Sequence, residues 1–292
     1  MKTTIYEQTY QCGDSELKLG TSTLIMGILN VTPDSFSDGG RFNDTDRAVQ
    51  HALQLAAEGA DLIDIGGEST RPGHVSISAD EELERVLPVI QAIHREAPHI
   101  PLSIDTYKAE VARQALMAGA HIINDVWGCK ADPGMAAVAA ELDCPIILMH
   151  NRSNRDYRNL MEDVKSDLME SVHLARSAGV NANRIILDPG IGFAKDYTEN
   201  MKVMMSLDEL AGLGYPILLA TSRKKFIRTA LDLPVDDVIE GTAATVAFGI
   251  AQGCQLVRVH DVKEIKRTVM MSDAMLYAAP GLKRVTIQGS TT

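Results

Sequence analysis

The chain has 292 residues and an apolar share of 45%, which suits one large α/β domain with a sizeable core. Its net charge of −11 argues against nucleic acid or an anionic membrane as the main partner. The start of the chain is polar, and nowhere do about 18 apolar residues run together, so neither a signal peptide nor a membrane span is expected.

The four cysteines are scattered along the chain and form no C-x-x-C pair. This spacing indicates neither a disulfide framework nor a zinc site. Together with the lack of a targeting segment, it predicts a soluble protein of the reducing cytoplasm.

Residues 5–20 alternate weakly between apolar and polar positions around Gly13-Asp14, which predicts a hairpin that closes the bottom of the domain. Eight short apolar runs follow, and a helix-patterned segment separates each from the next. The runs are residues 23–29, 62–65, 101–104, 121–123, 145–149, 185–187, 216–220 and 255–259. Continuous Ile, Leu and Val runs are typical of parallel strands buried on both faces. The repeated alternation predicts a (β/α)₈ TIM barrel.

Helix boundaries can be predicted from capping residues and from glycines. Asp44 or Thr45 is expected to cap the helix after the first run, and Gly59 to end it. No linker marks a second domain. The expected organisation is a hairpin extension at 1–22, the barrel at 23–280 and a flexible C-terminal tail at 281–292.

A polar or charged residue stands just past every apolar run. These residues are Asn30, Glu68, Asp105, Asn124, His150, Asp188, Ser222 and His260. Barrel enzymes place their chemistry at the C-terminal ends of the strands. We therefore expect this set to gather on one working face.

The segment GGESTRPG at 66–73 directly follows the second run. Its paired glycines allow close backbone approach, Thr70 offers a hydroxyl, and Arg71 offers five N–H donors to an anion. A glycine-rich surface turn would have the same composition. The position on the working face favours a functional loop.

The segment SRKK at 222–225 follows the seventh run and opens a helix, which Ser222 is expected to cap. Arg258 and His260 alternate with valines and so share one face of the eighth strand. Lys224 and its neighbour could simply be solvated. Clustered cations beside the usual phosphate position of barrels nevertheless predict an anionic ligand.

Asp105, Asn124 and Asp188 end the third, fourth and sixth runs and need partners if they are buried. Lysines could supply them in a structural ion-pair network. The alternative is a flat heterocycle whose N–H groups meet the carboxylates edge-on. His150 suits a structural or a functional role equally.

Metal motifs such as H-E-x-x-H or a cysteine cluster are lacking in the sequence. A Mg²⁺ held mainly by substrate phosphates would need only one or two protein oxygens and would leave no motif.

Seven segments together resemble dihydropteroate synthases, in family order from about residue 23 to about residue 275. They are NVTPDSFSDGG (30–40), GESTRPG (67–73), SIDT (103–106), IND (123–125), DPGIGF (188–193), SRK (222–224) and RVHD (258–261). The resemblance implies a (β/α)₈ barrel, usually a homodimer, in folate synthesis. It implies condensation of 6-hydroxymethyl-7,8-dihydropterin diphosphate with 4-aminobenzoate, with sulfonamides as competitors.

The resemblance also implies residue roles, position by position. Pterin contacts would be Asp105, Asn124, Asp188 and Lys224, with Met149 and Phe193 as further substrate contacts. Diphosphate contacts would be Thr70, Arg258 and His260, with Asn30 as a ligand of Mg²⁺. Contacts to 4-aminobenzoate would be Phe36, Arg71, Pro72 and Ser222. Asp105, Lys224 and Arg71 are expected to be catalytic.

Two other functions fit part of this pattern. Pterin-binding domains of corrinoid methyltransferases resemble this barrel, but they need no diphosphate site. The anion-binding residues Thr70, Arg71, Lys224, Arg258 and His260 therefore argue against them. A silent paralogue would bind pterin without condensing it, and it should have eroded loops after the first two strands. Both loops look intact.

Overall fold

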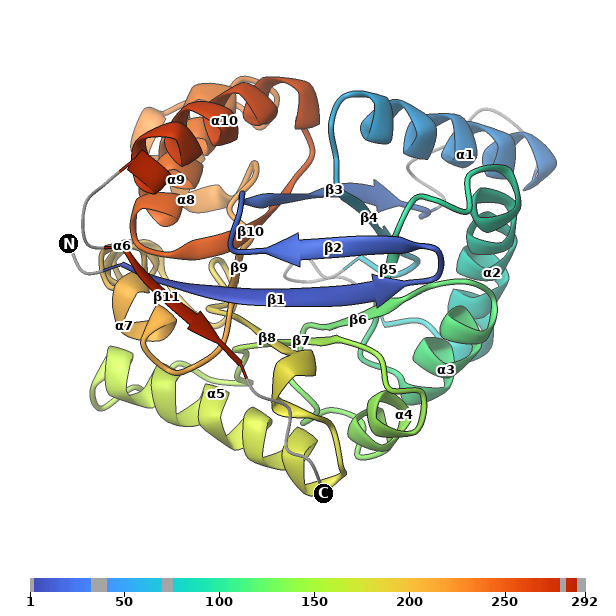
Figure 1. Cartoon of the computed structure of the whole chain (residues 1–292), viewed down its shortest axis with the longest axis horizontal. Coiled ribbons are helices and arrows are strands. Elements are labelled where there is room, and N and C mark those ends of the chain that lie inside the picture. The colour runs from blue at the N-terminus through green and yellow to red at the C-terminus, as the bar shows by residue number, and fades with distance from the viewer. Residues whose placement is uncertain (1–2, 33–40, 70–75, 279–281, 288–292) are drawn as a thin grey trace.

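The structure is a computed structural model that describes residues 3–32, 41–69, 76–278 and 282–287, with residues 41–43 as backbone only. Eight parallel strands form a closed barrel in the order β10-β3-β4-β5-β6-β7-β8-β9 (Figure 1). They are β3 Leu24–Asn30, β4 Leu62–Gly66, β5 Leu102–Asp105, β6 Ile122–Asp125, β7 Ile146–Met149, β8 Ile185–Asp188, β9 Ile217–Leu219 and β10 Cys254–Val259. Every predicted run overlaps one of these strands, so the predicted TIM barrel is confirmed.

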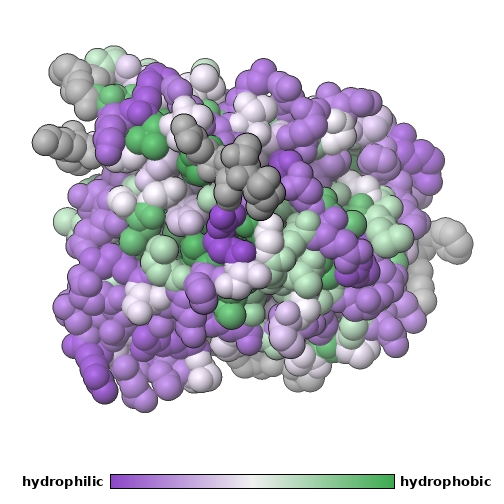
Figure 2. All heavy atoms as spheres, turned by 60° about the horizontal axis from the view of Figure 1, so that its bottom comes forward, coloured by the Kyte–Doolittle hydropathy of each residue, from purple (hydrophilic) through white to green (hydrophobic). Residues whose placement is uncertain are grey.

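Helices surround the barrel on its outside (Figure 1). They are α1 Arg41–Ala57, α2 Ala79–Glu96, α3 Ala109–Met117, α4 Met135–Glu141, α5 Leu160–Ser177, α6 Tyr197–Met205, α7 Leu207–Ala211, α8 Lys225–Leu231, α9 Ile239–Ala251 and α10 Val262–Ala278, with a 3₁₀ turn at Ala182–Arg184. Their apolar sides and the outward side chains of the strands form one continuous core. On the face drawn in Figure 2, hydrophilic residues predominate and hydrophobic ones form smaller patches between them. No described helix is long and apolar enough to cross a membrane.

The first helix begins earlier than the capping residues predicted. It starts at Arg41, so Asp44 lies in its first turn and does not cap it. A carboxylate in the first turn still interacts favourably with the positive end of the helix dipole. Cap chemistry alone therefore placed this boundary several residues too late.

The predicted hairpin is present as β1 Thr4–Cys12 and β2 Ser15–Leu19, which pair antiparallel and cross in front of the barrel in Figure 1. Its buried face includes Tyr10 and Leu17, which share a cluster with the inward residues Met26 and Ile147. Leu24 and Leu62, the first residues of their strands, belong to the same cluster. The hairpin therefore closes the N-terminal end of the barrel and leaves the opposite end open for a site.

Part of the segment predicted to be a flexible tail is ordered. Residues Lys283–Thr286 form β11, which pairs parallel with β1 and makes a three-stranded sheet in the order β11-β1-β2. The free edge of β1 offers backbone N–H and C=O groups, and a strand that pairs there satisfies them.

Candidate active site

The C-terminal ends of the strands bring together the side chains that the sequence analysis singled out. Asp105 ends β5, Asn124 lies in β6 and Asp188 ends β8, and the three are buried. Arg258 reaches the same place from β10. The predicted convergence is therefore observed for these residues, whereas Glu68 pairs with Lys108 and His150 with Lys195 and Asp167.

A carboxylate that the sequence analysis missed lies at the centre of this mouth. Asp64, fully buried in β4, accepts hydrogen bonds from Arg258 Nε at 2.6 Å and from Asn124 Nδ2 at 2.9 Å. Arg258 Nη2 donates to Asp105 Oδ2 at 2.8 Å. The cation that pairs with Asp105 is thus an arginine and not a lysine. Asp64 interrupts an apolar run instead of ending one, and a charge inside such a run was the signal that could have identified it.

The mouth retains unused hydrogen-bond acceptors. Among the described residues, Asp64 Oδ1 and Asp105 Oδ1 are buried without a hydrogen-bond partner. Burial raises the pKa of Asp105 to about 7, Arg258 opposes the shift, and Asp64 adds to it. Buried acceptors left unpaired are costly unless something satisfies them, so a ligand with N–H donors fits this place.

Asp188 and Lys224 face the mouth from the other side. Asp188 Oδ1 accepts the N–H of Gly190 at 2.7 Å, and burial raises its pKa while Lys224 opposes the shift. Burial lowers the pKa of Lys224 to about 8, against the attraction of Asp188. The Lys224 ammonium donates to the carbonyl of Ile191 and lies 4.9 Å from the centre of the Phe193 ring. The carboxylates and the Lys224 ammonium thus supply both acceptors and a donor to the same mouth.

The two further substrate contacts expected from the resemblance, Met149 and Phe193, lie next to Asp188 and Lys224. Met149 is buried and is paired in register with Asp188 across β7 and β8. Phe193 lies in the loop after β8, against Lys224. An apolar thioether and an aromatic ring suit the faces of a planar ring system.

Ser222 does not cap a helix, so that prediction was wrong. The helix α8 begins at Lys225, because residues 221–224 form a turn in which Arg223 has a φ of +59°. Ser222 instead hydrogen bonds to His260, with its Oγ 3.0 Å from Nδ1 and accepting the backbone N–H at 3.2 Å. Lys225 is exposed, as expected for a solvated lysine. The serine and the histidine therefore form one polar unit beside Lys224.

Asn30, at the end of β3, is exposed and pairs in register with Gly66. A Cβ built on Gly66 would lie 3.9 Å from Asn30 Oδ1 and 3.6 Å from Asp105 Oδ2, so the glycine keeps this part of the mouth open. One accessible amide oxygen fits a Mg²⁺ ion whose other ligands are phosphate oxygens and water. The described residues contain no group of three His, Cys, Asp or Glu that could bind a metal by themselves.

Four of the expected site residues, Phe36, Thr70, Arg71 and Pro72, lie outside the described residues. The other ten are described, namely Asn30, Asp105, Asn124, Met149, Asp188, Phe193, Ser222, Lys224, Arg258 and His260.

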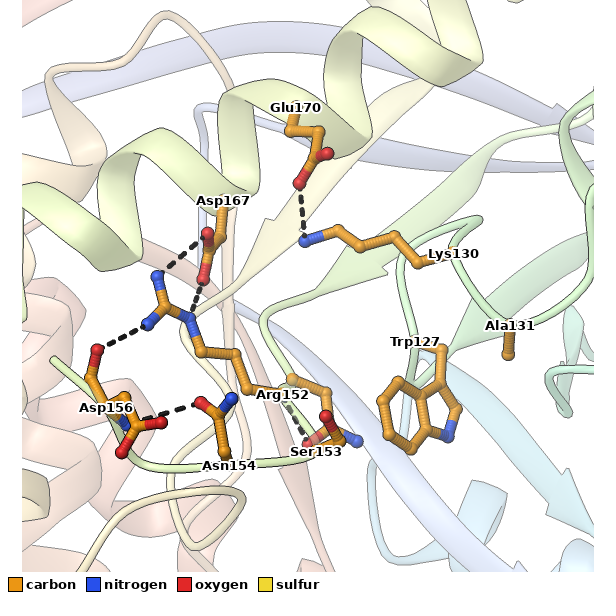
Figure 3. A pocket seen from close by; sticks show the side chains of 10 residues that line it. Trp127, Lys130, Ala131, Arg152, Ser153, Asn154, Asp156, Asp167 and Glu170 are labelled. Carbon is orange, nitrogen blue, oxygen red and sulfur yellow. Dashed lines mark hydrogen bonds and ion pairs between the residues drawn. The ribbon is translucent and has the colours of Figure 1, made fainter.

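A separate cavity of about 590 Å³ lies between the loops that follow β6 and β7 (Figure 3). Its charged side chains pair with one another, Arg152 with Asp167 at 2.5 Å and Lys130 with Glu170 at 3.5 Å. The unpartnered Oδ1 atoms of Asp64 and Asp105 belong to the barrel mouth, and neither residue lines this cavity.

Comparison with known proteins agrees with this geometry. The family described as pterin binding enzyme matches residues 26–260. The dihydropteroate synthase of Bacillus subtilis (strain 168) is 59% identical over 262 residues, which cover 90% of this chain and 92% of that protein.

Two solved structures are similar to the whole barrel. Dihydropteroate synthase from Clostridium difficile, solved in the presence of pteroic acid, is 50% identical with a TM-score of 0.86, over 88% of this chain and 97% of that chain. The Xanthomonas albilineans enzyme with 4-aminobenzoic acid is 39% identical with a TM-score of 0.88, over 94% and 100%. The barrel mouth is charged and rich in acceptors, and the relatives match nearly the whole length of the chain. The chain therefore belongs to the pterin binding enzyme family, among the dihydropteroate synthases.

Proposed function

We infer that this protein condenses 6-hydroxymethyl-7,8-dihydropterin diphosphate with 4-aminobenzoate to give 7,8-dihydropteroate and diphosphate, a step of folate synthesis. The observation that carries this function is the arrangement of the mouth within a dihydropteroate synthase barrel. Carboxylates of Asp64, Asp105 and Asp188 supply acceptors, and Lys224 supplies a donor across from Asp188.

Recognition of the pterin follows from hydrogen-bond polarity. A pterin edge presents N–H and amino donors, which the Oδ1 atoms of Asp64 and Asp105 and the carboxylate of Asp188 can accept. Lys224 donates to the ring acceptors on the opposite edge, while Phe193 and Met149 contact the ring. Because these carboxylates are buried, charge-assisted hydrogen bonds to them are strong.

The chemistry we propose is dissociative, so that diphosphate leaves before the amine attacks. Positive charge then develops on the pterin, and the carboxylates of Asp105 and Asp188 stabilise it because they are already fixed in place. Arg258 and His260, at alternating positions of β10 and the residue after it, stabilise the negative charge of the leaving group. Thr70 and Arg71 are proposed to assist there and at the arylamine.

Mg²⁺ is proposed to bind with the diphosphate, with Asn30 as its protein ligand. When bound, the ion would neutralise part of the charge on the leaving group. Asn30 supplies a neutral oxygen and leaves the remaining coordination positions to phosphate and water.

The carboxylate of 4-aminobenzoate is proposed to bind at Ser222, with Phe36, Arg71 and Pro72 completing the wall. The hydrogen bond to His260 fixes the position of the Ser222 oxygen. Sulfonamides resemble this substrate in shape and charge, so we propose that they compete with it.

The reaction is tested by measuring diphosphate release with both substrates and with each one alone. We expect release only when pterin diphosphate and 4-aminobenzoate are both present, and 7,8-dihydropteroate as the second product. Pterin binding without release would instead indicate a silent paralogue. Methyl transfer to a corrinoid would indicate the other alternative.

A homodimer is proposed as the working unit. Exposed apolar side chains lie on helices that pack next to one another, namely Leu231 on α8, Phe248 on α9, and Met271 and Met275 on α10. Exposed apolar side chains on neighbouring elements are typical of protein–protein contact surfaces.

The cytoplasm is proposed as the location of the protein. Support comes from the four cysteines, all of which are free and buried.

A further inference from the structure

The loop after β8, residues 189–194, has an unusual backbone. Gly190, Gly192 and Ala194 adopt φ values of +65°, +85° and +47°. This loop carries the carbonyl of Ile191, which accepts from Lys224, and the ring of Phe193, which lies against the same ammonium. The two glycines adopt positive φ readily, whereas Ala194 does so at a cost, so its surroundings must hold it there.

Lys195, the residue after this loop, folds its side chain back beneath it. Its Nζ lies 3.1 Å from the carbonyl oxygen of Gly190, 3.1 Å from that of Phe193 and 2.8 Å from His150 Nδ1. The side chain is buried, with a residue exposure of 8%. An ammonium has three N–H donors, and here three acceptors are available for them.

His150 connects this ammonium to a carboxylate. It is fully buried, and its Nε2 lies 3.0 Å from Asp167 Oδ2. Because Nδ1 accepts from Lys195, Nε2 carries the proton and donates to Asp167, which is the neutral tautomer. Burial lowers the pKa of His150 to about 4, in agreement with a neutral ring. Asp167 also accepts hydrogen bonds from Arg152 (Figure 3), so the chain of hydrogen bonds from Lys195 through His150 ends at a carboxylate that is itself held in place.

The backbone around His150 is in direct contact with the loop. A Cβ built on Gly190 would lie 1.9 Å from the carbonyl oxygen of His150, and the N–H of His150 donates to the carbonyl of Asp188 at 2.9 Å. Displacement of His150 or Lys195 would therefore move the segment that carries Asp188 and Phe193.

We propose that Lys195, held by His150 and Asp167, is a positioning residue for pterin recognition: by binding the carbonyls of Gly190 and Phe193 it keeps the loop against Lys224. This assignment rests on the proposed function, in which Lys224 and Phe193 contact the pterin. Burial lowers the pKa of Lys195 to about 7 and Asp188 opposes the shift, while the two carbonyls and His150 bind the protonated form.

The test compares three variants with a matched control. Lys195→Met keeps the aliphatic stem and removes the donors. His150→Leu removes the acceptor, whereas His150→Gln keeps one acceptor and one donor. Lys165→Met is the control, because Lys165 pairs with Glu162 and Glu209 on the outside of the barrel.

Three quantities are measured for each folded protein: affinity for 6-hydroxymethylpterin by calorimetry, KM and kcat for pterin diphosphate, and Tm. We expect Lys195→Met and His150→Leu to weaken pterin binding about tenfold or more, as loss of charge-assisted hydrogen bonds predicts. KM should rise in parallel with little change in kcat, because the lost contacts serve substrate and transition state alike. His150→Gln should recover most of the affinity, and Lys165→Met should resemble the wild type.

Pterin affinity within twofold of wild type in Lys195→Met, even with a lowered Tm, would show a purely structural lysine and overturn the proposal. If Lys195→Met does not fold, equal pterin affinity of His150→Leu and His150→Gln overturns it in the same way. Failure of the wild type to bind pterin or to release diphosphate would instead refute the proposed function.

Discussion

Arg258 is the cation on which two buried carboxylates depend. It donates to Asp64 and Asp105 at 2.6 and 2.8 Å, and its side chain is 17% exposed. Removing one member of a buried ionic group leaves uncompensated charge and costs about 3–5 kcal/mol. The same arginine is a proposed diphosphate contact, so stability and substrate binding depend on one side chain.

Arg258→Gln is expected to be destabilised more at pH 8 than at pH 5.5. The folded pKa of Asp105 is already about 7, above its unfolded value, and loss of Arg258 raises it further. A raised carboxylate pKa means that the folded state binds more protons than the unfolded state, so stability falls as pH rises through this window. Urea unfolding of both proteins at the two pH values measures the difference. Equal destabilisation at both would contradict the role of the guanidinium.

Asp188→Asn is expected to weaken pterin binding by roughly 30- to 1,000-fold, because an acceptor facing ring N–H groups becomes partly a donor, which costs about 2–4 kcal/mol. Calorimetric titration of a pterin measures this change. The exposed Asp208→Asn is the matched control and should bind as the wild type does. A loss below threefold in Asp188→Asn would mean that the aspartate serves the loop alone, through Gly190.

Residues at the ends of apolar runs could be predicted from the sequence, and Asp105, Asn124 and Asp188 lie where expected. Asp64 could not be found in this way, since it lies inside a run. Lys195 could not either, because its contacts with His150 depend on how two loops fold back on each other. Ser222 follows β9 as expected but does not cap the next helix, because a turn delays the start of α8.

At the scale of elements, strands were easier to predict than helix starts. A parallel strand buried on both faces is marked by every residue it contains, whereas a helix start depends on one or two capping groups. The N-terminal hairpin was predicted from weak alternation and one turn signal. Its parallel partner β11 was not, because pairing between residues 4–7 and 283–286 leaves no local pattern.

The hairpin should stabilise the barrel without affecting the site. Tyr10 is fully buried against the closed end, so Tyr10→Ala is expected to cost about 3–5 kcal/mol, by analogy with other buried aromatics. Its hydroxyl has no hydrogen-bond partner among the described residues, so Tyr10→Phe should be neutral or slightly stabilising. Urea unfolding tests both. Pterin affinity measured on the folded variants should stay unchanged, and a large loss would link the two ends of the barrel.

At the scale of the whole molecule, the exposed methionines of α10 bear on the proposed dimer. Met271 and Met275 are 60% and 58% exposed and lie four residues apart on α10. Replacing both with lysine should convert the proposed dimer to a monomer, because two buried unpaired charges oppose association. Sedimentation at several concentrations measures this. The pair Lys263→Met and Lys266→Met on the same helix is the control; dissociation by the control alone would place the contact elsewhere.

The pairing of β1 with β11 has a consequence for synthesis on the ribosome. Thr4 pairs with Lys283, so this edge of β1 stays open until residues 283–286 have been made. All eight barrel strands precede Lys283, and the barrel could close while this edge is still unpaired. An unpaired strand edge is a template for pairing with another chain. Nascent chains that end before residue 283 should therefore associate more readily than chains that include β11, and crowded polysomes are where that association would occur.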